Sequence, residues 1–151
     1  MGIGSRRIGR EYALRVLYAH EMTKNSIDGI FDDALMGKFD SEKTRIFSSK
    51  LVHLYLENIQ EFDEIIRLKA MNWEFHRIAI LDRIILRIGV CELKFFEDVP
   101  PKVSINEAIE ISKKYSTEKS GKFINGILDA VLQDLKDSGQ FIKTGRGLVE
   151  E

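Results

Sequence analysis

The 151-residue sequence is poor in the residues that build disulfide-bonded and turn-rich proteins: it has one cysteine and two prolines. A single cysteine excludes an intramolecular disulfide framework and fits a reducing compartment, so we expect a cytoplasmic protein. The shortage of proline favours long helices over a turn-rich β fold. No apolar run approaches the ~18 residues of a membrane span, and no apolar stretch follows the basic start as in a secretory signal. We therefore expect no membrane contact.

The chain also lacks a large net charge. Its 23 Lys and Arg side chains against 24 Asp and Glu give a formal net charge of −1, a total that by itself argues against a nucleic-acid-binding protein. The charges are segregated, however: residues 1–20 carry a net of +3, residues 21–64 carry −5 and residues 113–133 carry +2. The two basic segments form one patch only if the fold brings them together.

Apolar residues recur at spacings of three and four along almost the whole sequence, which predicts an all-α protein with about seven helices. The segment Ile78–Val90 is apolar enough to resemble a buried strand, but Asp82, Arg83 and Arg87 fall on one side at helical spacing. A Ser-x-x-Glu capping box at Ser104 predicts another helix start just after the two prolines. Other helices are predicted near residues 8–20, 31–36 and 46–66, with a last one between Gly121 and Gly139.

One helical domain is predicted over residues 1–139, followed by a flexible C-terminal tail at 140–151. Gly139 stands where a helix C-cap is expected, and the residues beyond it have scattered glycine and charge. Asn125 and Gly126 fall inside the last predicted helix, where glycine costs about 1 kcal/mol relative to alanine. We expect another backbone to pack against Gly126, and Asn125 to be half-buried and hydrogen-bonded.

Residue patterns typical of catalysis or metal binding do not occur. His20, His53 and His76 are scattered, and none of them pairs at metal-ligand spacing. Cys91 lies in an apolar segment, which is typical of a buried structural thiol. No glycine-rich phosphate-binding motif occurs. We therefore expect no enzyme activity, no metal and no cofactor.

The remaining polar features are basic. Arg6, Arg7 and Arg10 open the first predicted helix, either as a solvated terminus or as guanidinium forks that bind phosphate. Lys119, Ser120 and Lys122 surround a second predicted helix start, where free backbone N–H groups favour an anion. Phe123 follows directly, and it either points into the core or lies at the margin and stacks on a base.

Four blocks of the sequence resemble the NusB family of bacterial transcription antitermination factors. The blocks occur in the family's order and spacing over residues 6–129, and the stretch from Val99-Pro100 to the Asn-Gly-x-Leu-Asp motif at 125–129 is highly specific. They are Arg6-Arg7-x-x-Arg10-Glu11-x-Ala13-x-x-x-Leu17-Tyr18, Leu81-Asp82-Arg83-x-x-Leu86-Arg87-x-x-x-x-Glu92-Leu93, Asp98-Val99-Pro100-Pro101-Lys102-Val103-Ser104-Ile105-Asn106-Glu107-Ala108 and Glu118-Lys119-Ser120-Gly121-Lys122-Phe123-Ile124-Asn125-Gly126-Ile127-Leu128-Asp129.

The resemblance implies a NusB-like fold of two packed three-helix bundles, with neither catalysis nor metal. It also implies binding to single-stranded boxA RNA of ribosomal or phage transcripts together with NusE, a small-subunit ribosomal protein. The complex would join elongating RNA polymerase with other Nus factors and suppress premature termination, as in transcription of rRNA operons. By position, Arg6, Arg7 and Arg10 would contact RNA phosphates, and Tyr18 and Asp82 would lie near the NusE surface. A second RNA-facing segment would comprise Lys119, Ser120, Lys122 and Phe123.

Two departures from the family pattern act in opposite directions on phosphate attraction. Ile8-Gly9 interrupts a tract that is more continuously basic in some relatives, whereas Lys119 stands where some have an acidic residue.

Two alternative functions stay open. One is an accessory RNA-binding module of an rRNA methyltransferase, for which the chain shows no methyl-donor loop and leaves no room for a catalytic domain. The other is a protein-only adaptor or homodimer scaffold that binds no RNA.

Overall fold

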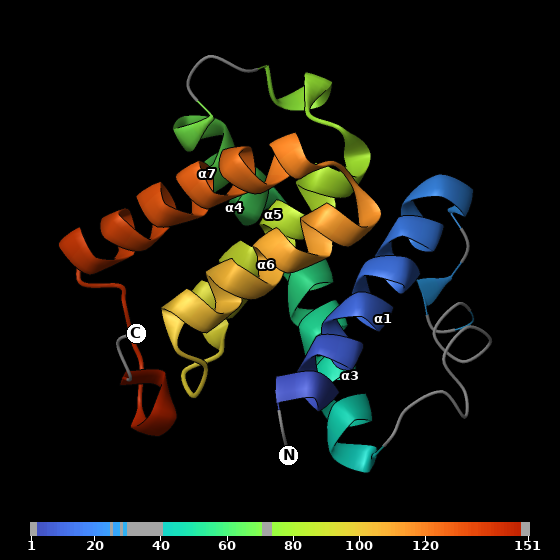
Figure 1. Ribbon diagram of the computed structural model, residues 1–151, viewed down its shortest axis with the longest axis horizontal. Coiled ribbons are helices and arrows are strands. Elements are labelled where there is room, and N and C mark those ends of the chain that lie inside the picture. Colours follow the sequence, from blue (N-terminus) through green and yellow to red (C-terminus); the bar gives the residue numbers. More distant parts are fainter. Residues whose placement is uncertain (1–2, 25, 28, 30–40, 71–73, 149–151) are drawn as a thin grey trace. The chain divides into compact units, whose positions relative to one another are not determined.

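The computed structural model describes residues 3–24, 26–27, 29, 41–70 and 74–148. Over these residues it is all-helical, with six α-helices and two short 3₁₀-helices, which confirms the predicted fold class (Figure 1). The short helix predicted near residues 31–36 lies outside the described residues. By its internal contacts the chain forms two compact units, residues 1–56 and 57–151. Among the described residues, no helix is both long and apolar enough to cross a membrane.

The first unit holds α1 (Ile3–Thr23) and nearly all of α3 (Glu42–Glu57). These helices approach closely at Gly9, where a Cβ atom would lie 3.0 Å from Phe47 Cδ2 and 3.4 Å from the Thr44 carbonyl oxygen. Ser48 Oγ donates a hydrogen bond to the Gly9 carbonyl oxygen at 2.9 Å. The glycine that interrupts the basic start of the chain therefore allows α1 and α3 to pack together.

The ends of these helices follow local chemistry. Lys24, just after α1, has a φ of 60°, which ends the helix a few residues beyond the predicted residue 20. Ser41 Oγ accepts a hydrogen bond from the Thr44 backbone N–H at 3.2 Å, as an N-cap serine does. The helix predicted without a break from Ile46 to Ile66 is wrong, because Asn58 separates α3 from α4 (Ile59–Lys69) with φ −124° and ψ 18°. With these angles Asn58 leaves the helical conformation, and its carbonyl oxygen accepts from the Phe62 N–H at 3.0 Å to begin α4.

The second unit is built around α5 (Ile80–Phe95), which contacts α4, α6 (Pro101–Tyr115) and α7 (Glu118–Asp137). As predicted, this apolar segment is a helix, and every residue from Ile84 to Leu93 is buried. α5 and α7 are in close contact at Gly89, where a Cβ atom would lie 2.7 Å from Leu128 Cδ1. Two 3₁₀-helices, η1 (Phe75–Arg77) and η2 (Gly145–Leu148), also belong to this unit.

Two predicted helix starts are wrong. α6 begins at Pro101 rather than at Ser104, because proline at the first helical position loses no needed N–H and its fixed φ fits the helix. Ser104 makes no capping box: its Oγ donates instead to Glu92 Oε1 on α5 at 3.0 Å. α7 begins at Glu118, three residues earlier than predicted, because Thr117 caps it and its Oγ1 accepts from the Ser120 backbone N–H at 3.2 Å.

Residues 140–148 follow α7 and lie against the end of α5. Lys143 Nζ donates hydrogen bonds to the carbonyl oxygens of Glu92 and Phe96 at 3.1 and 2.7 Å. The Thr144 backbone N–H donates to the Glu97 carbonyl oxygen at 2.9 Å. The Glu92 and Phe96 carbonyl oxygens also accept from the backbone N–H groups of Phe96 and Val99, so Lys143 gives each of them a second donor. The predicted single domain over residues 1–139 and the predicted flexibility of residues 140–151 stay predictions.

Candidate nucleic-acid interface

The basic start of the chain lies on the first turns of α1. Arg7 is exposed, Arg6 is half-buried and Arg10 is only 1% exposed. The guanidinium carbons of Arg6 and Arg10 lie 5.1 and 5.2 Å from the centre of the Phe47 ring on α3, within cation–π distance. One arginine of the predicted phosphate-binding set therefore faces the surface fully, and another is part of the core of this unit. The sequence signal for this difference is the helical period, which places Arg10 one turn from the buried Ala13 and Leu14.

Farther along α1, Tyr18 and Met22 form an exposed apolar pair. They are 37% and 59% exposed and lie one helical turn apart. Tyr18 is one of the predicted protein-partner residues, and Met22 is not. Its signal in the sequence is its spacing of four from Tyr18, which puts both on one helix face. Two exposed large apolar side chains on one face are typical of a protein contact.

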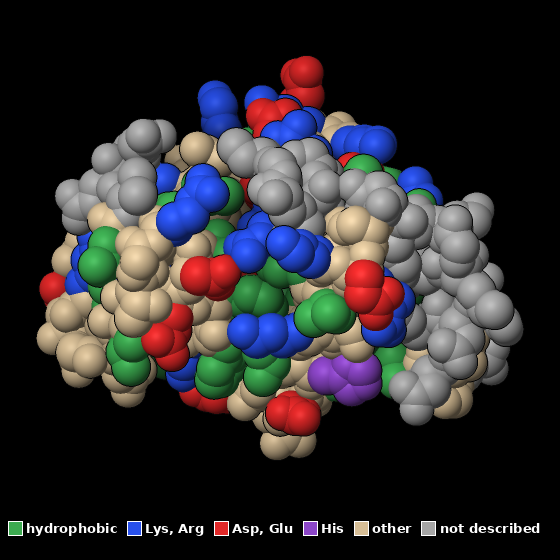
Figure 2. Space-filling model, turned by 90° about the horizontal axis from the view of Figure 1, so that it is seen from below, with side chains coloured by type: hydrophobic (Ala, Val, Ile, Leu, Met, Phe, Trp, Pro, Cys, Tyr) green, Lys and Arg blue, Asp and Glu red, His purple; other side chains and the backbone are tan. Residues whose placement is uncertain are grey.

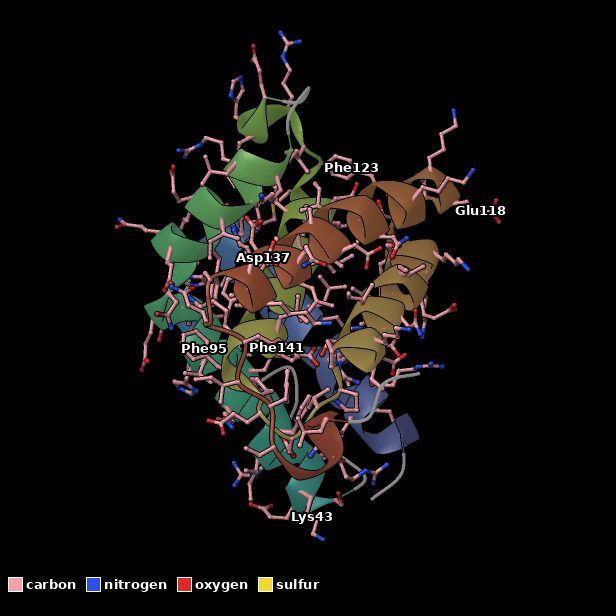
Figure 3. The ribbon with its side chains drawn as sticks, turned by 90° about the vertical axis from the view of Figure 1, so that its left-hand side faces the viewer. Lys43, Phe95, Glu118, Phe123, Asp137 and Phe141 are labelled. Atoms are coloured by element: carbon pink, nitrogen blue, oxygen red, sulfur yellow. The ribbon has the colours of Figure 1, made fainter. Side chains whose placement is uncertain are left out.

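The second group of predicted RNA-binding residues, Lys119, Ser120, Lys122 and Phe123, lies on the first two turns of α7. Lys119 and Lys122 are exposed, whereas Ser120 and Gly121 face inward and are buried. Phe123 is half-buried, so it lies at the margin of the fold rather than wholly in the core. Figure 3 shows Glu118 and Phe123 near the start of α7 and Asp137 at its far end. This end of the helix therefore presents two cations beside a partly exposed aromatic ring.

Ser120 is held by a buried hydrogen bond. Its Oγ donates to Asp82 Oδ2 on α5 at 2.8 Å and lies 3.1 Å from the hydroxyls of both Ser116 and Thr117. Asp82 is 8% exposed, and its Oδ1 has no hydrogen-bond partner among the described residues. Both residues lie in the first turns of their helices, whose dipoles favour the carboxylate. Ser120, predicted to face RNA, and Asp82, predicted to lie near NusE, are thus hydrogen-bonded to each other. They are 38 positions apart in the sequence, so no local pattern predicts this contact.

The helix start is less open to anions than its sequence predicts. Thr117 Oγ1 already accepts from the Ser120 N–H, so this donor is used inside the protein. The cationic side chains of Lys119 and Lys122 are the groups that the surface presents. On the face shown in Figure 2, Lys and Arg side chains lie among acidic and hydrophobic ones. At the start of α7 an anion would therefore meet the two lysine side chains rather than the Ser120 N–H.

Asn125 and Gly126 both lie on the exposed face of α7. A Cβ atom at Gly126 would meet no atom within 4 Å. The predictions that another backbone packs on Gly126 and that Asn125 is half-buried are therefore wrong. The physical reason is the helical period: Ile124, Ile127 and Leu128 face the core, and the two residues between them face outward. The cost of about 1 kcal/mol for a mid-helix glycine is consequently not offset by packing in this unit.

Among the residues that the structure describes, no group of three or more His, Cys, Asp or Glu side chains could hold a metal ion. Cys91 is completely buried in α5, as predicted.

An all-helical chain with cations exposed at two helix starts, one of them beside a half-buried phenylalanine, has the features of a small nucleic-acid-binding protein. The model of the NusB family matches residues 7–133, so the chain belongs to the NusB family. The transcription antitermination protein NusB of Salinibacter ruber (strain DSM 13855 / M31) is 47% identical over 148 residues, which cover 97% of this chain and 92% of that protein.

Solved structures of related proteins agree with this assignment. The structure of T. maritima NusB has a TM-score of 0.80 at 35% identity and covers 85% of this chain and 91% of that one. A crystal structure of the antitermination factors NusB and NusE in complex with dsRNA has a TM-score of 0.74 at 28% identity, with coverage of 86% and 97%. The resemblance of the sequence to this family is thereby confirmed.

Proposed function

We propose that this chain is an RNA-binding transcription antitermination factor of the cytoplasm without catalytic activity. It binds boxA-type RNA together with NusE and joins elongating RNA polymerase with other Nus factors, supporting transcription of rRNA operons. The observation that carries the proposal is the start of α7, where exposed Lys119 and Lys122 lie beside half-buried Phe123. Cations on the backbone and an aromatic ring against a base are how proteins bind single-stranded RNA. A solved complex of the related antitermination factors NusB and NusE with dsRNA supports RNA and NusE as the partners.

Roles for the individual residues follow from their exposure. Arg7, Lys119 and Lys122 contact phosphates, and Phe123 stacks on a base. The guanidinium groups of Arg6 and Arg10 lie over the Phe47 ring, so we propose that these two arginines make a weaker or indirect electrostatic contribution to RNA binding. On α1, Tyr18 contacts NusE, and the exposed Met22 extends that surface. Asp82 is proposed as a NusE-facing position from the family match alone, because its side chain is mostly buried.

The experiment is a titration of boxA RNA, with and without NusE, at several salt concentrations. Each phosphate neutralised on a single strand contributes about 0.7 to the slope of log K against log salt. Arg7→Ala and Lys122→Ala should each weaken binding and reduce that slope. Lys136→Ala is the matched control, because Lys136 lies in the last turn of the same helix as Lys122. Its slope should equal that of the unsubstituted protein.

Phe123→Ala tests the stacking role. If the ring stacks on a base, its removal should weaken RNA binding by about 1–3 kcal/mol. The helical circular dichroism should be retained, and its loss would assign Phe123 to the core instead. A scrambled RNA is the control for sequence preference.

Other results would contradict the proposal. A salt-independent affinity, or equal affinity for boxA and scrambled RNA, would do so. Binding to NusE without any effect on RNA would identify a protein-only adaptor, and size-exclusion chromatography would detect a homodimer scaffold. Methyl transfer to rRNA in a direct assay would identify an enzyme accessory module.

A further inference from the structure

Asn125 and Gly126 are the part of the specific family motif for which the fold itself gives no reason. Both are exposed in the middle of α7, and apart from the adjacent residues and the helix's own backbone, no described atom lies within 4 Å of a Cβ built on Gly126. Glycine is a poor residue for a helix interior because it loses more conformational freedom on folding than other residues do. A glycine here therefore weakens the helix without improving the packing inside this unit. Gly126 would have a function if a ligand lies against the helix backbone at this position.

The neighbours on this face indicate what kind of ligand it is. Lys122 lies one helical turn before Asn125 and Gly126, and Lys119 lies one turn before Lys122. All four residues are exposed, so two cations lead along the helix to an amide side chain and a bare stretch of backbone. Asp129, also exposed, is the first acidic residue of this face beyond them. Its carboxylate repels phosphate and marks where a polyanion would leave the helix.

We propose that Asn125 and Gly126 form a base-recognition contact that continues the RNA surface from Lys119 and Lys122. The missing side chain at Gly126 allows a splayed nucleotide to lie against the helix. The Asn125 amide, which has both donors and acceptors, pairs with the edge of its base. The lysines position the RNA backbone, and Asn125 contributes to discrimination between bases. The inference rests on the function proposed above.

RNA is a better match to this face than a second protein. A protein contact would favour exposed apolar side chains, and from Lys119 to Asp129 the fully exposed side chains of α7 are charged or amide. The face also continues directly from the proposed phosphate contacts on the same helix. Both arguments favour a polyanion whose bases can turn toward the protein.

The test is Gly126→Ala in the full-length chain, with synthetic boxA RNA and a scrambled RNA as probes. Alanine fits the open space and favours the helix, so the denaturation midpoint should rise. The same methyl group should hold the nucleotide away, so affinity for boxA RNA should fall about tenfold, as for one lost hydrogen bond or contact. If Gly126 were needed only for folding, Gly126→Ala would lower both the denaturation midpoint and the affinity for boxA RNA. A surface glycine without a ligand would raise stability and leave affinity unchanged, which would overturn the proposal.

Two further variants separate the roles. Asn125→Ala should reduce the ratio of boxA to scrambled affinity, whereas Lys122→Ala should weaken both RNAs alike and reduce the salt slope. Gln133→Ala is the matched control, because Gln133 is exposed farther along the same face. Its RNA affinity should not change.

The outcomes also distinguish this inference from the proposed function. If Lys122→Ala weakens RNA binding and Gly126→Ala does not, only the base-recognition contact is wrong. If neither substitution changes RNA binding, the proposed RNA surface on α7 is wrong as well. If Gly126→Ala weakens NusE binding and leaves RNA affinity unchanged, the face belongs to the protein partner and the base-recognition contact is wrong.

Discussion

Replacing Ser120 with alanine tests whether this residue acts in the fold or at the RNA. The substitution removes the 2.8 Å hydrogen bond to Asp82 Oδ2, and Oδ1 already has no partner among the described residues. A hydrogen bond to a charged group contributes about 1.5–3 kcal/mol, so we expect Ser120→Ala to lower the free energy of unfolding by about 2 kcal/mol. With a urea m-value of about 2 kcal/mol/M, the midpoint should fall by about 1 M.

Urea denaturation followed by circular dichroism measures this loss, and a double-mutant cycle assigns it. In an Asp82→Ala background, Ser120→Ala should have much less effect, because the acceptor is gone. Ser138→Ala is the control: Ser138 lies just after the other end of α7, and its hydroxyl makes only a long 3.4 Å contact with a backbone carbonyl. Its midpoint should change little.

RNA binding completes the test. If Ser120 only positions the start of α7, Ser120→Ala should leave the salt slope unchanged in conditions where the protein is fully folded. An unchanged urea midpoint together with weaker RNA binding would refute this reasoning. It would establish Ser120 as a direct RNA contact, as the family resemblance implies.

Three other substitutions test the packing of the second unit. Burial lowers the pKa of Lys143 from 10.5 to about 8. Between these pH values the folded chain binds fewer protons than the unfolded chain, so the free energy of unfolding should rise with pH relative to Lys143→Met. A pH-independent difference in urea melts would contradict this. Arg87→Met leaves Asp63 without its buried partner at 2.6 Å and should cost about 3 kcal/mol in urea melts; Asp63→Asn in the same chain should recover part of it. Gly89→Ala overpacks against Leu128 and should lower thermal stability by about 1–3 kcal/mol, and an unchanged melting temperature would mean that the leucine moves aside freely.

Helix content was predictable from the sequence because it depends on the apolar period, which is local. The polar residues of Ile78–Val90 on one side were enough to distinguish α5 from a strand. The break at Asn58 was not predictable, since the apolar period continues through it and only the backbone angles change. The start of α6 was mispredicted because Ser104 matches a capping motif, yet its hydroxyl bonds to a carboxylate of α5. A local motif does not reveal a competing partner that is distant in sequence.

Some features of the candidate site were likewise predictable from the sequence, and others were not. The cationic character of the two helix starts is visible in the composition of short segments. The helical period also places Arg10 on the side of buried Ala13 and Leu14, but its contact with Phe47 was not predictable, because Phe47 comes from a different helix. The outward position of Asn125 and Gly126 was predictable from the helical period, which is a stronger signal here than the association of glycine with close packing.

The complete burial of Cys91 turns the chain's sole thiol into a reporter of its motions. A thiol reagent can reach this sulfur only when α5 and the helices packed on it separate, so the labelling rate measures the opening of residues 57–151. A ligand that binds only the closed form slows labelling in proportion to its occupancy. RNA affinity could thus be measured by mass spectrometry on the unaltered protein, with neither a fluorophore nor an engineered cysteine.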